Sequence, residues 1–377
     1  MLIPTLRHSI SRTSPRVSRE RLMSSSARLS RSPVSLVTPS QLSDLLERDR
    51  QEGKVVPLDA SWFMPNLEPK RYGYEEFRTK RIKGAAFWDV DQIASTSDVG
   101  VPHNIPSTSQ FEDAASRLGI SRDSHVVVYD STGVFSSPRT AFTFSHFNHP
   151  LISVLDGGLP RWEAEQHPID TKIPSNPNPH DVEANEGARP KFGPILSELL
   201  YAKKPKVESY FIADIEENFT DYKVDGAEKE DVKQWDDMDA NIDKGDQGEV
   251  VLDARPTGRF NGTDPEPRPG LSSGHMPHSL SLPSTAVLSS ESSTTPKYKT
   301  LLPTYELEGV FEKAMGKETW ELVKKGEKAV TTTCGSGMTA AILWLALQKC
   351  GVEAPVSIYD ESWTGYASRE KSKIVKN

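Results

Sequence analysis

Short runs of apolar residues recur in the same order in the two halves of the chain. Each half has a run ending in Asp-Ala, a second run before a loop and a helix-forming stretch, and a third run that closes the half. Short apolar runs bounded by loops are typical of strands buried inside a parallel sheet. The three pairs are residues 55–60 with 250–254, 126–130 with 329–333, and 154–158 with 356–360.

The order strand, loop, helix and strand predicts βαβ units, whose strands pair in parallel and whose helices cover the sheet. Further apolar stretches at 84–87 and 280–283 fit the same repeated plan. We therefore expect an α/β protein with two tandem domains, each a parallel sheet with helices on both faces.

A stretch rich in proline, asparagine and charge between the halves predicts a surface linker. We place the first domain at residues 33–170, the linker at 171–200 and the second domain at 201–377. Residues 215–249 are crowded with Asp and Glu, and we expect them to form an irregular, solvated insertion. A docking surface for a basic partner is the alternative for this segment.

The composition is typical of a globular chain. The 377 residues are 36% hydrophobic and 26% charged, and they include no apolar run of the roughly 18 residues needed to cross a membrane. The net charge of −8 has the wrong sign for neutralising phosphates. We therefore expect small-molecule or protein partners, and neither nucleic acid nor membrane. The two cysteines, Cys334 and Cys350, do not suggest a disulfide framework.

Residues 1–32 are rich in Arg and Ser and contain a single acid, Glu20. This composition is typical of a mitochondrial presequence, and a disordered basic tail is the alternative. Initiation at Met23 would remove most of the basic residues. We therefore predict a mitochondrial protein, with a cytoplasmic form if Met23 is used.

The halves differ at the loop after the second strand, where only the second half has a cysteine. This loop, residues 334–339 (CGSGMT), leads into a helix-forming stretch, whereas residues 131–137 of the first half contain no cysteine. Backbone N–H groups and the helix dipole stabilise a thiolate at a helix N-terminus and lower the pKa of a cysteine from about 8.5. Gly335 and Gly337 let the backbone curl so that several N–H groups point at one anion.

A free cysteine is often no more than a small buried hydrophobic residue. Cys334, however, stands where open α/β sheets bind ligands, outside the carboxyl ends of the strands. We interpret Cys334 as a nucleophile and Cys350, at the far end of the same helix, as structural.

These motifs, taken in order, resemble those of the rhodanese and mercaptopyruvate sulfurtransferase family over nearly all of the chain after the first 32 residues. Members of that family that prefer thiosulfate have basic residues after the cysteine, whereas members that prefer 3-mercaptopyruvate have the Cys-Gly-Ser-Gly found here. The matching pieces are LDASW at 58–62, PR at 138–139, LDGG at 155–158, LDAR at 252–255, GRF at 258–260, PEPR at 265–268, GH at 274–275, YD at 359–360 and SW at 362–363.

The resemblance implies two rhodanese-like domains and a sulfurtransferase that carries sulfur as a Cys334 persulfide. The sulfur would come from 3-mercaptopyruvate, pyruvate would leave, and thioredoxin or another thiol would accept the sulfur, with no metal or organic cofactor. Planar guanidinium groups suit the carboxylate and keto oxygen of this donor. The resemblance assigns catalytic roles to Cys334 and Ser336 and substrate binding to Arg259, Arg268, Gly335, Gly337, Met338 and Thr339, with Arg255 as a weaker candidate.

Members of the family are often described with a Ser, His, Asp relay, of which Ser336 matches the serine. The histidine expected before the GAAF stretch is Arg81 in this chain. We therefore expect that the relay does not operate as described. Either the groups of the substrate handle the proton, or Arg81 supplies a fixed positive charge.

Other functions remain open at this stage. The same chemistry fits a thiosulfate sulfurtransferase or a sulfur-relay protein for transfer RNA thiolation. Phosphatases with a related fold have a longer loop that ends in Arg, whereas the sixth residue after Cys334 is Ala340. His275 and His278 form an HxxH pair without a third ligand nearby, so we interpret them as part of a turn.

Overall fold

The structure, a computed structural model, describes residues 34–172, 220–226 and 231–377. These residues belong to one compact unit, Ser32–Asn377, which is separate from Met1–Arg31. The predicted presequence and residues 173–200 of the predicted linker lie outside the described residues.

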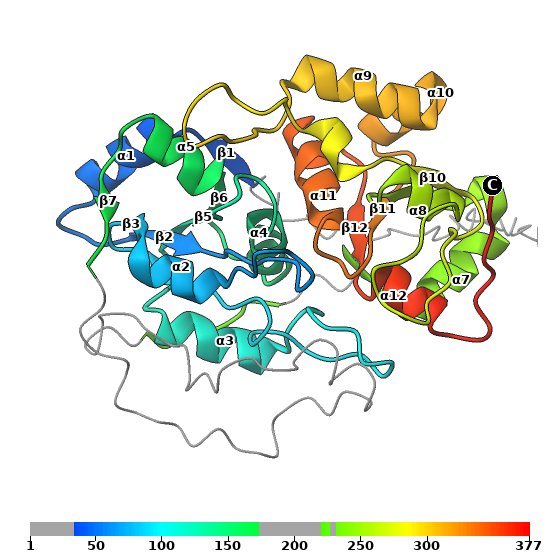
Figure 1. The fold of residues 1–377 in the computed structure, drawn as a ribbon, viewed down its shortest axis with the longest axis horizontal. Helices are drawn as coiled ribbons and strands as arrows, with labels where there is room; N and C mark the ends of the chain where they lie inside the picture. Colours follow the sequence, from blue (N-terminus) through cyan, green and yellow to red (C-terminus); the bar gives the residue numbers. More distant parts are fainter. Residues whose placement is uncertain (1–33, 173–219, 227–230) are drawn as a thin grey trace, which may run out of the picture. The chain divides into compact units, whose positions relative to one another are not determined.

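The first half forms a five-stranded sheet in the order β1-β6-β5-β2-β4, and every neighbouring pair is parallel (Figure 1). Parallel neighbours require crossover connections, which the helices of this half supply. The strands are β1 (Ser35–Val37), β2 (Val55–Asp59), β4 (Ala86–Phe87), β5 (His125–Tyr129) and β6 (Ile152–Leu155).

Helices cover both faces of this sheet because successive side chains of a strand point to opposite sides. Val128 of β5 belongs to the same apolar cluster as Phe111 of α3, whereas its neighbour Val127 packs with Leu42 of α1 and Leu159 of α5. The helices are α1 (Pro39–Arg48), α2 (Gly73–Thr79), α3 (Thr108–Arg117), α4 (Ser137–His146) and α5 (Gly158–Ala164), and β3 (Arg81–Ile82) and β7 (Ile169–Asp170) form a separate antiparallel pair.

The second half repeats this plan with the order β10-β9-β11-β12-β8, again parallel throughout. Leu252 of β9 belongs to the same apolar cluster as Phe311 of α9, whereas its neighbour Val251 belongs to the cluster on the other face, with Met238 of α7 and Trp363 of α12. The predicted fold class is therefore confirmed. The strands are β8 (Val232–Lys233), β9 (Val250–Asp253), β10 (Ser279–Ser281), β11 (Val330–Thr333) and β12 (Val356–Tyr359).

The remaining helices of the second half are short, and two of them are single 3-10 turns. They are α7 (Trp235–Asp243), η2 (Gly245–Gln247), α8 (Thr257–Asn261), η3 (Ser284–Val287), α9 (Thr304–Met315), α10 (Lys317–Lys324), α11 (Ala340–Lys349) and α12 (Ser362–Ala367).

The expectation of an irregular segment at 215–249 is wrong for its second part, which contains β8, α7 and η2. Asp236 and Asp237 lie in the first turn of α7, where carboxylates favour the positive end of the helix dipole. Met238 and Ile242, four residues apart, are buried beneath the helix. The acids that suggested a loop are thus the polar face and the start of an amphipathic helix.

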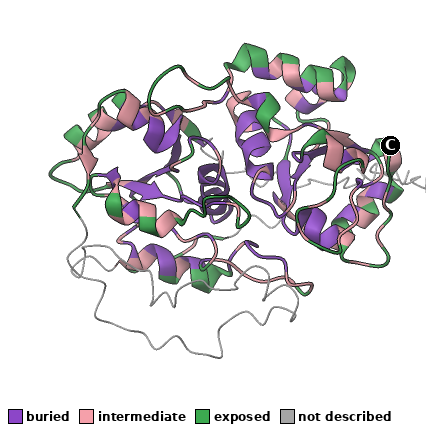
Figure 2. Cartoon of the chain, viewed as in Figure 1, coloured by how far each residue is buried: buried purple, intermediate pink, exposed green. Residues whose placement is uncertain are grey.

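One apolar core runs through both domains, because α4 of the first domain packs against α11 of the second. The rings of Phe142 and Trp344 meet edge to face with centroids 5.2 Å apart. All ten residues of α4 are buried, and Figure 2 shows the same burial along most of α11. The two domains therefore do not behave as separate globules within the described residues.

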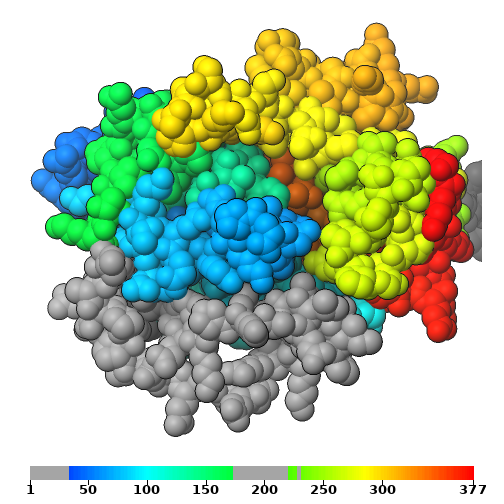
Figure 3. Space-filling view, in the orientation of Figure 1, coloured from blue at the N-terminus to red at the C-terminus, as the bar shows by residue number. Residues whose placement is uncertain are grey.

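Two further segments join the domains. An arm of the second domain, residues 289–302, reaches the first domain, where the N–H group of Leu301 donates to Asp156 at 3.0 Å (the yellow surface beside the green one in Figure 3). Residues 220–226 lie against α3, where the amide of Tyr222 donates to Ser116 at 3.0 Å and its ring meets Phe111.

Candidate active site

Cys334 follows β11 directly and is buried, with 2% of its surface exposed. In the second domain, Thr333 at the end of β11 lies opposite Asp253 at the end of β9. In the first domain, Tyr129 at the end of β5 lies opposite Asp59 at the end of β2. The next residues in the two domains are Cys334 and Asp130. The strand register therefore gives Asp130 the place in the first domain that Cys334 has in the second.

The segment after β12 supports the loop of Cys334. The hydroxyl of Ser362 accepts hydrogen bonds from the amides of Cys334 (3.1 Å) and Gly337 (3.0 Å), and it donates to the carbonyl of Tyr359 (2.8 Å). The carbonyl of Gly335 accepts a hydrogen bond from the amide of Thr364 at 3.0 Å. Gly337 has a φ of +80°, a conformation that favours glycine.

Several amides of the loop are free to face an anion. The N–H groups of Gly335, Ser336, Met338 and Thr339 have no hydrogen-bond partner within the described ranges. Thr339 is the N-cap of α11, so the helix dipole acts on the same region. The amide of Gly337 is not free in this way because Ser362 already binds it.

The corresponding loop of the first domain is closed around its own carboxylate. Five amides and one hydroxyl converge on Asp130, which shows that a turn between strand and helix can gather N–H groups around one anion. Because Asp130 fills this nest, the first domain has no room there for a substrate anion. The donors are the amides of Thr132, Gly133, Phe135, Ser136 and Ser137 at 2.7–3.1 Å and the hydroxyl of Ser137 at 2.7 Å.

Arg268 lies at the edge of the Cys334 loop. Its Nη1 donates to Oγ1 of Thr364 at 2.9 Å, and a β-carbon built on Gly335 would lie 3.9 Å from that nitrogen. Nε of Arg268 is buried and has no partner among the described residues. Burial lowers the pKa of Arg268, while the nearby charges of Cys334 and Glu266 act in the opposite direction. An unpartnered, buried guanidinium donor beside a thiol is suited to bind an anionic substrate.

Arg259 lies close enough to Arg268 for its charge to add to burial in lowering the pKa of Arg268. Nη1 of Arg259 lies 3.6 Å from Glu266, and the Arg259 side chain is 22% exposed. Glu266 is itself buried and pairs with Arg255 at 2.7 Å. The sequence analysis did not single out Glu266, although its place in the PEPR stretch next to Arg268 was a usable signal.

Arg255, the weaker candidate for substrate binding, is held in an internal network of ion pairs. Its guanidinium is 1% exposed and binds Asp253 at 2.6 Å, Glu266 at 2.7 Å and the carbonyl of Gly274 at 2.7 Å. It also lies 4.2 Å above the ring of Trp363. With its donors occupied by the protein, Arg255 cannot act as a free substrate clamp.

Arg81 does not supply a charge to the Cys334 loop. It is the buried first residue of β3, and its Nη2 donates to Asp170 of β7 and to the carbonyl of Lys172, both at 3.0 Å. The alternative that assigned Arg81 a part in the chemistry is therefore wrong, because the side chain is bound to the first domain's antiparallel pair.

The structure places another histidine in a buried acid–base pair. Nδ1 of His103 lies 2.8 Å from Asp91, and the indole N–H of Trp62 donates to the same carboxylate at 3.0 Å. The carbonyl of His103 accepts a hydrogen bond from Arg139 at 2.7 Å, and Arg139 in turn adjoins Gly337 of the Cys334 loop. Sequence reasoning sought a histidine only before the GAAF stretch and so missed His103.

The other predicted groups have structural surroundings. Cys350 is half-buried, and burial raises its pKa to about 12. His275 stacks on Phe260 with ring centroids 4.0 Å apart, and His278 is largely exposed. Within the described part of the chain no three His, Cys, Asp or Glu side chains gather as metal ligands, and no helix there is long and apolar enough to span a membrane.

Comparison with known proteins gives a consistent family. The rhodanese-like domain matches residues 40–165 and again 234–369. A probable 3-mercaptopyruvate sulfurtransferase of Schizosaccharomyces pombe is 32% identical over 84% of this chain and 87% of its own, and a mitochondrial thiosulfate/3-mercaptopyruvate sulfurtransferase of Arabidopsis thaliana is 32% identical over 90% and 79%. The sulfur transferase subunit of yeast mitochondrial complex I superposes with a TM-score of 0.67 at 29% identity, covering 90% of this chain and 98% of the subunit. This chain therefore belongs to the rhodanese-like family of two-domain sulfurtransferases.

Proposed function

We propose that this protein transfers sulfur from 3-mercaptopyruvate to a thiol through a persulfide on Cys334. The observation that carries the proposal is a buried cysteine inside a loop of free amides, with the unpartnered Nε of Arg268 at the edge of that loop. Amides and a guanidinium group together suit a substrate with both a sulfur anion and a carboxylate.

In the first step, the Cys334 thiolate attacks the sulfur of the substrate and forms a sulfur–sulfur bond. The bond between that sulfur and the methylene carbon breaks, and its electron pair leaves on pyruvate as the enolate, which then takes up a proton. Arg268 and Arg259 hold the carboxylate and keto oxygen, and the loop amides stabilise the sulfur anions. A second thiol then attacks the outer sulfur and regenerates the Cys334 thiolate.

His103 is our candidate for the proton transfer. Asp91 lies 2.8 Å from Nδ1, although not in hydrogen-bonding geometry, so we assign the proton transfer to Nε2, the other ring nitrogen. This pair would take the histidine and acid places of the relay whose serine is Ser336. With His103 as its histidine, the relay does not need a histidine at position 81, where this chain has Arg81 in the antiparallel pair of β3 and β7.

The uncharged loop supports 3-mercaptopyruvate over thiosulfate as the donor. The residues after Cys334 are Gly, Ser, Gly, Met and Thr, so the nearest charged group is Arg268 at the loop edge, with Arg259 close to it, where a carboxylate would reach them. A thiosulfate dianion gains most from cations beside the sulfur itself. The relatives that share the fold include enzymes named for both donors.

We also propose thioredoxin or another thiol as the acceptor and the mitochondrion as the compartment, with a cytoplasmic form made from Met23. The basic first 32 residues support the compartment, and the Arabidopsis relative and the complex I subunit are both mitochondrial by name.

Pyruvate formation from 3-mercaptopyruvate and sulfite formation from thiosulfate, each with the same thiol acceptor, test the proposal side by side. We expect kcat/KM for 3-mercaptopyruvate to be at least about ten-fold higher, the effect of one charge-assisted contact. A preference for thiosulfate would assign the chain to thiosulfate sulfurtransferases instead, and the absence of both reactions would overturn the proposal.

A further inference from the structure

Arg139 of the first domain lies under the catalytic loop of the second. It sits in the first turn of α4, is 2% exposed, and its Nη2 donates to Asp360 at 2.5 Å and to the carbonyl of His103 at 2.7 Å. Asp360 follows β12, directly before the segment that holds the Cys334 loop. One guanidinium therefore binds the loop support of the second domain and the histidine-bearing loop of the first.

Gly337 is packed directly against this ion pair. A β-carbon at Gly337 would lie 2.9 Å from the carbonyl oxygen of Asp360 and 3.2 Å from Nη1 of Arg139. Nη1 is buried and has no partner in the described part of the chain. The Arg139–Asp360 pair thus forms the floor of the Cys334 loop beneath Gly337, whose left-handed backbone bends the loop.

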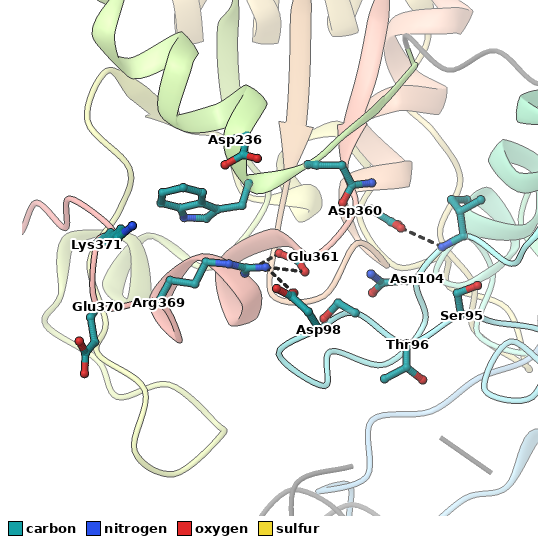
Figure 4. Close-up of a pocket in the computed structure, with 14 residues that line it drawn as sticks. Ser95, Thr96, Asp98, Asn104, Asp236, Asp360, Glu361, Arg369, Glu370 and Lys371 are labelled. Atoms are coloured by element: carbon teal, nitrogen blue, oxygen red, sulfur yellow. Dashed lines mark hydrogen bonds and ion pairs between the residues drawn. The ribbon is translucent and has the colours of Figure 1, made fainter. Parts of the chain in front are cut away.

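The second oxygen of Asp360 binds the first domain as well. Ile105 follows His103 by two residues, and its amide donates to Oδ2 of Asp360 at 2.9 Å, the bond drawn at Asp360 in Figure 4. Asp360 is therefore held by a side chain of α4 and by the backbone of the His103 loop. These bonds fix where His103 stands relative to Cys334, although the two residues belong to different domains.

We propose that Arg139 is a cross-domain positioning residue, which holds the Cys334 loop and His103 in their catalytic relation. The inference rests on the proposed function of Cys334 and goes beyond it, since it assigns the first domain a part in the chemistry although Asp130 fills that domain's own nest. Arginine suits this role because its planar Nη2 group carries two hydrogens, which reach one acceptor in each domain.

The same interface offers a matched control. A cavity of about 780 Å³ lies beside Asp360. Arg369, which lines it, binds Asp98 of the first domain at 2.7 Å and Glu361 of the second, as the dashed lines in Figure 4 mark. Arg369 thus also bridges the two domains, but neither Gly337 nor His103 is among its bonded partners in the described ranges. Removing it loosens the interface without removing the floor of the loop.

The experiment compares Arg139→Met, Arg139→Lys, Asp360→Asn, the Arg139→Met/Asp360→Asn double variant and Arg369→Met in the full-length protein. For Arg139→Met we expect kcat with 3-mercaptopyruvate to fall at least about ten-fold while KM stays within about two-fold, with partial rescue in Arg139→Lys. The double variant should lose no more than the worse single one, because both remove the same contact. Arg369→Met should keep kcat within about two-fold of wild type.

A second readout does not depend on the donor. The rate at which iodoacetamide alkylates Cys334 is followed by mass spectrometry at fixed pH. This rate should differ from the wild-type rate by about three-fold or more, in either direction, in Arg139→Met and should equal the wild-type rate in Arg369→Met. Should Arg139→Met fail to fold, Arg139→Lys and Asp360→Asn carry the same comparison. Unchanged kcat and an unchanged alkylation rate in folded Arg139 variants would overturn the inference. If the wild type did not turn over 3-mercaptopyruvate but Arg139→Met still altered the alkylation rate of Cys334, only the proposed donor reaction would be overturned.

Discussion

The two cysteines stand in opposite surroundings. Cys334 lies in a loop with free amides beside Arg268, whereas Cys350 ends the helix, and burial followed by the charge of Glu308 raises its pKa to about 12. We expect Cys334→Ser to abolish pyruvate formation and Cys350→Ser to retain most of it. Steady-state rates and mass detection of the persulfide measure this, and comparable losses in both variants would rule out a single sulfur-carrying cysteine.

The two arginines proposed to bind the substrate should differ in what they contribute. Arg268 is mostly buried with a free Nε, whereas Arg259 is partly exposed and 3.6 Å from Glu266. We expect Arg268→Ala and Arg259→Ala each to lower kcat/KM for 3-mercaptopyruvate by about 1.5–3 kcal/mol in transition-state free energy, roughly ten-fold to more than a hundred-fold, with the larger loss at Arg268. Lysine variants should recover only part of this, because an ammonium lacks the fork. Wild-type kinetics in the alanine variants would mean that neither arginine meets the substrate.

Arg81 should affect stability and not rate. Its guanidinium binds Asp170 and backbone carbonyls between β3 and β7, and the ion pair is largely buried. Arg81→His should therefore lower the free energy of unfolding by about 1–3 kcal/mol, through loss of a buried charge-assisted contact. Urea denaturation measures this effect, and a faster variant with a new ionisation in its pH–rate profile would contradict it.

Residue types at the site could be predicted only where they stand in a recognisable stretch. Cys334 and the two arginines stood out as chemistry-bearing residues in short motifs. Glu266, Asp360 and Ser362 also lie in matched stretches, but those stretches do not reveal which residues they bind. Their roles follow from the tertiary contacts alone.

At the scale of elements, the loop of Cys334 depends on α12 as much as on β11. Ser362, the first residue of α12, binds the amides of Cys334 and Gly337 with one hydroxyl. Ser362→Ala would leave two buried amides unpaired, so we expect at least a ten-fold lower kcat and a loss of about 1–3 kcal/mol in stability. Ser292→Ala, which removes a hydroxyl that accepts from the amide of Tyr298 on the exposed arm, is the matched control. Equal kcat in both variants would show that α12 does not organise the loop.

The repeated βαβ order was predictable because apolar runs and helix-forming stretches are local signals. The start of α7 was missed because Asp236 and Asp237, read as loop residues, also favour the first turn of a helix. The equivalence of Asp130 and Cys334 needed the strand register, since the two loops differ in length and share no residue type at that point.

At the scale of the whole molecule, the continuous core between α4 and α11 holds the first domain next to the loop of Cys334. Phe142 of α4 packs against Trp344 of α11, and Arg139 in the first turn of α4 therefore lies beside the Cys334 loop, which precedes α11. The sequence analysis divided the chain into two similar domains but could not show this contact. Packing between halves leaves no periodic signal in either one.

The stability of the whole molecule should depend on pH through Asp59, which ends β2 in the core of the first domain. Burial raises the pKa of Asp59 from 3.8 to about 7, against the hydrogen bond from the amide of Ser61 at 2.9 Å. The folded state therefore binds a proton that the unfolded chain has already released between about pH 4 and pH 7. Stability falls as pH rises through that window, and the full cost of roughly 4 kcal/mol is present above it.

Asp59→Asn removes this titration and keeps an oxygen to accept from Ser61. We expect the free energy of unfolding of the variant to equal or trail that of wild type near pH 4 and to exceed it by up to about 4 kcal/mol at pH 8. Urea unfolding at both pH values measures the difference, with Asp44→Asn on the exposed side of α1 as the control. If the two stability curves ran parallel from pH 4 to pH 8, Asp59 would be ionised in the folded protein throughout, and the buried end of β2 would have to hold a charge that its surroundings do not balance.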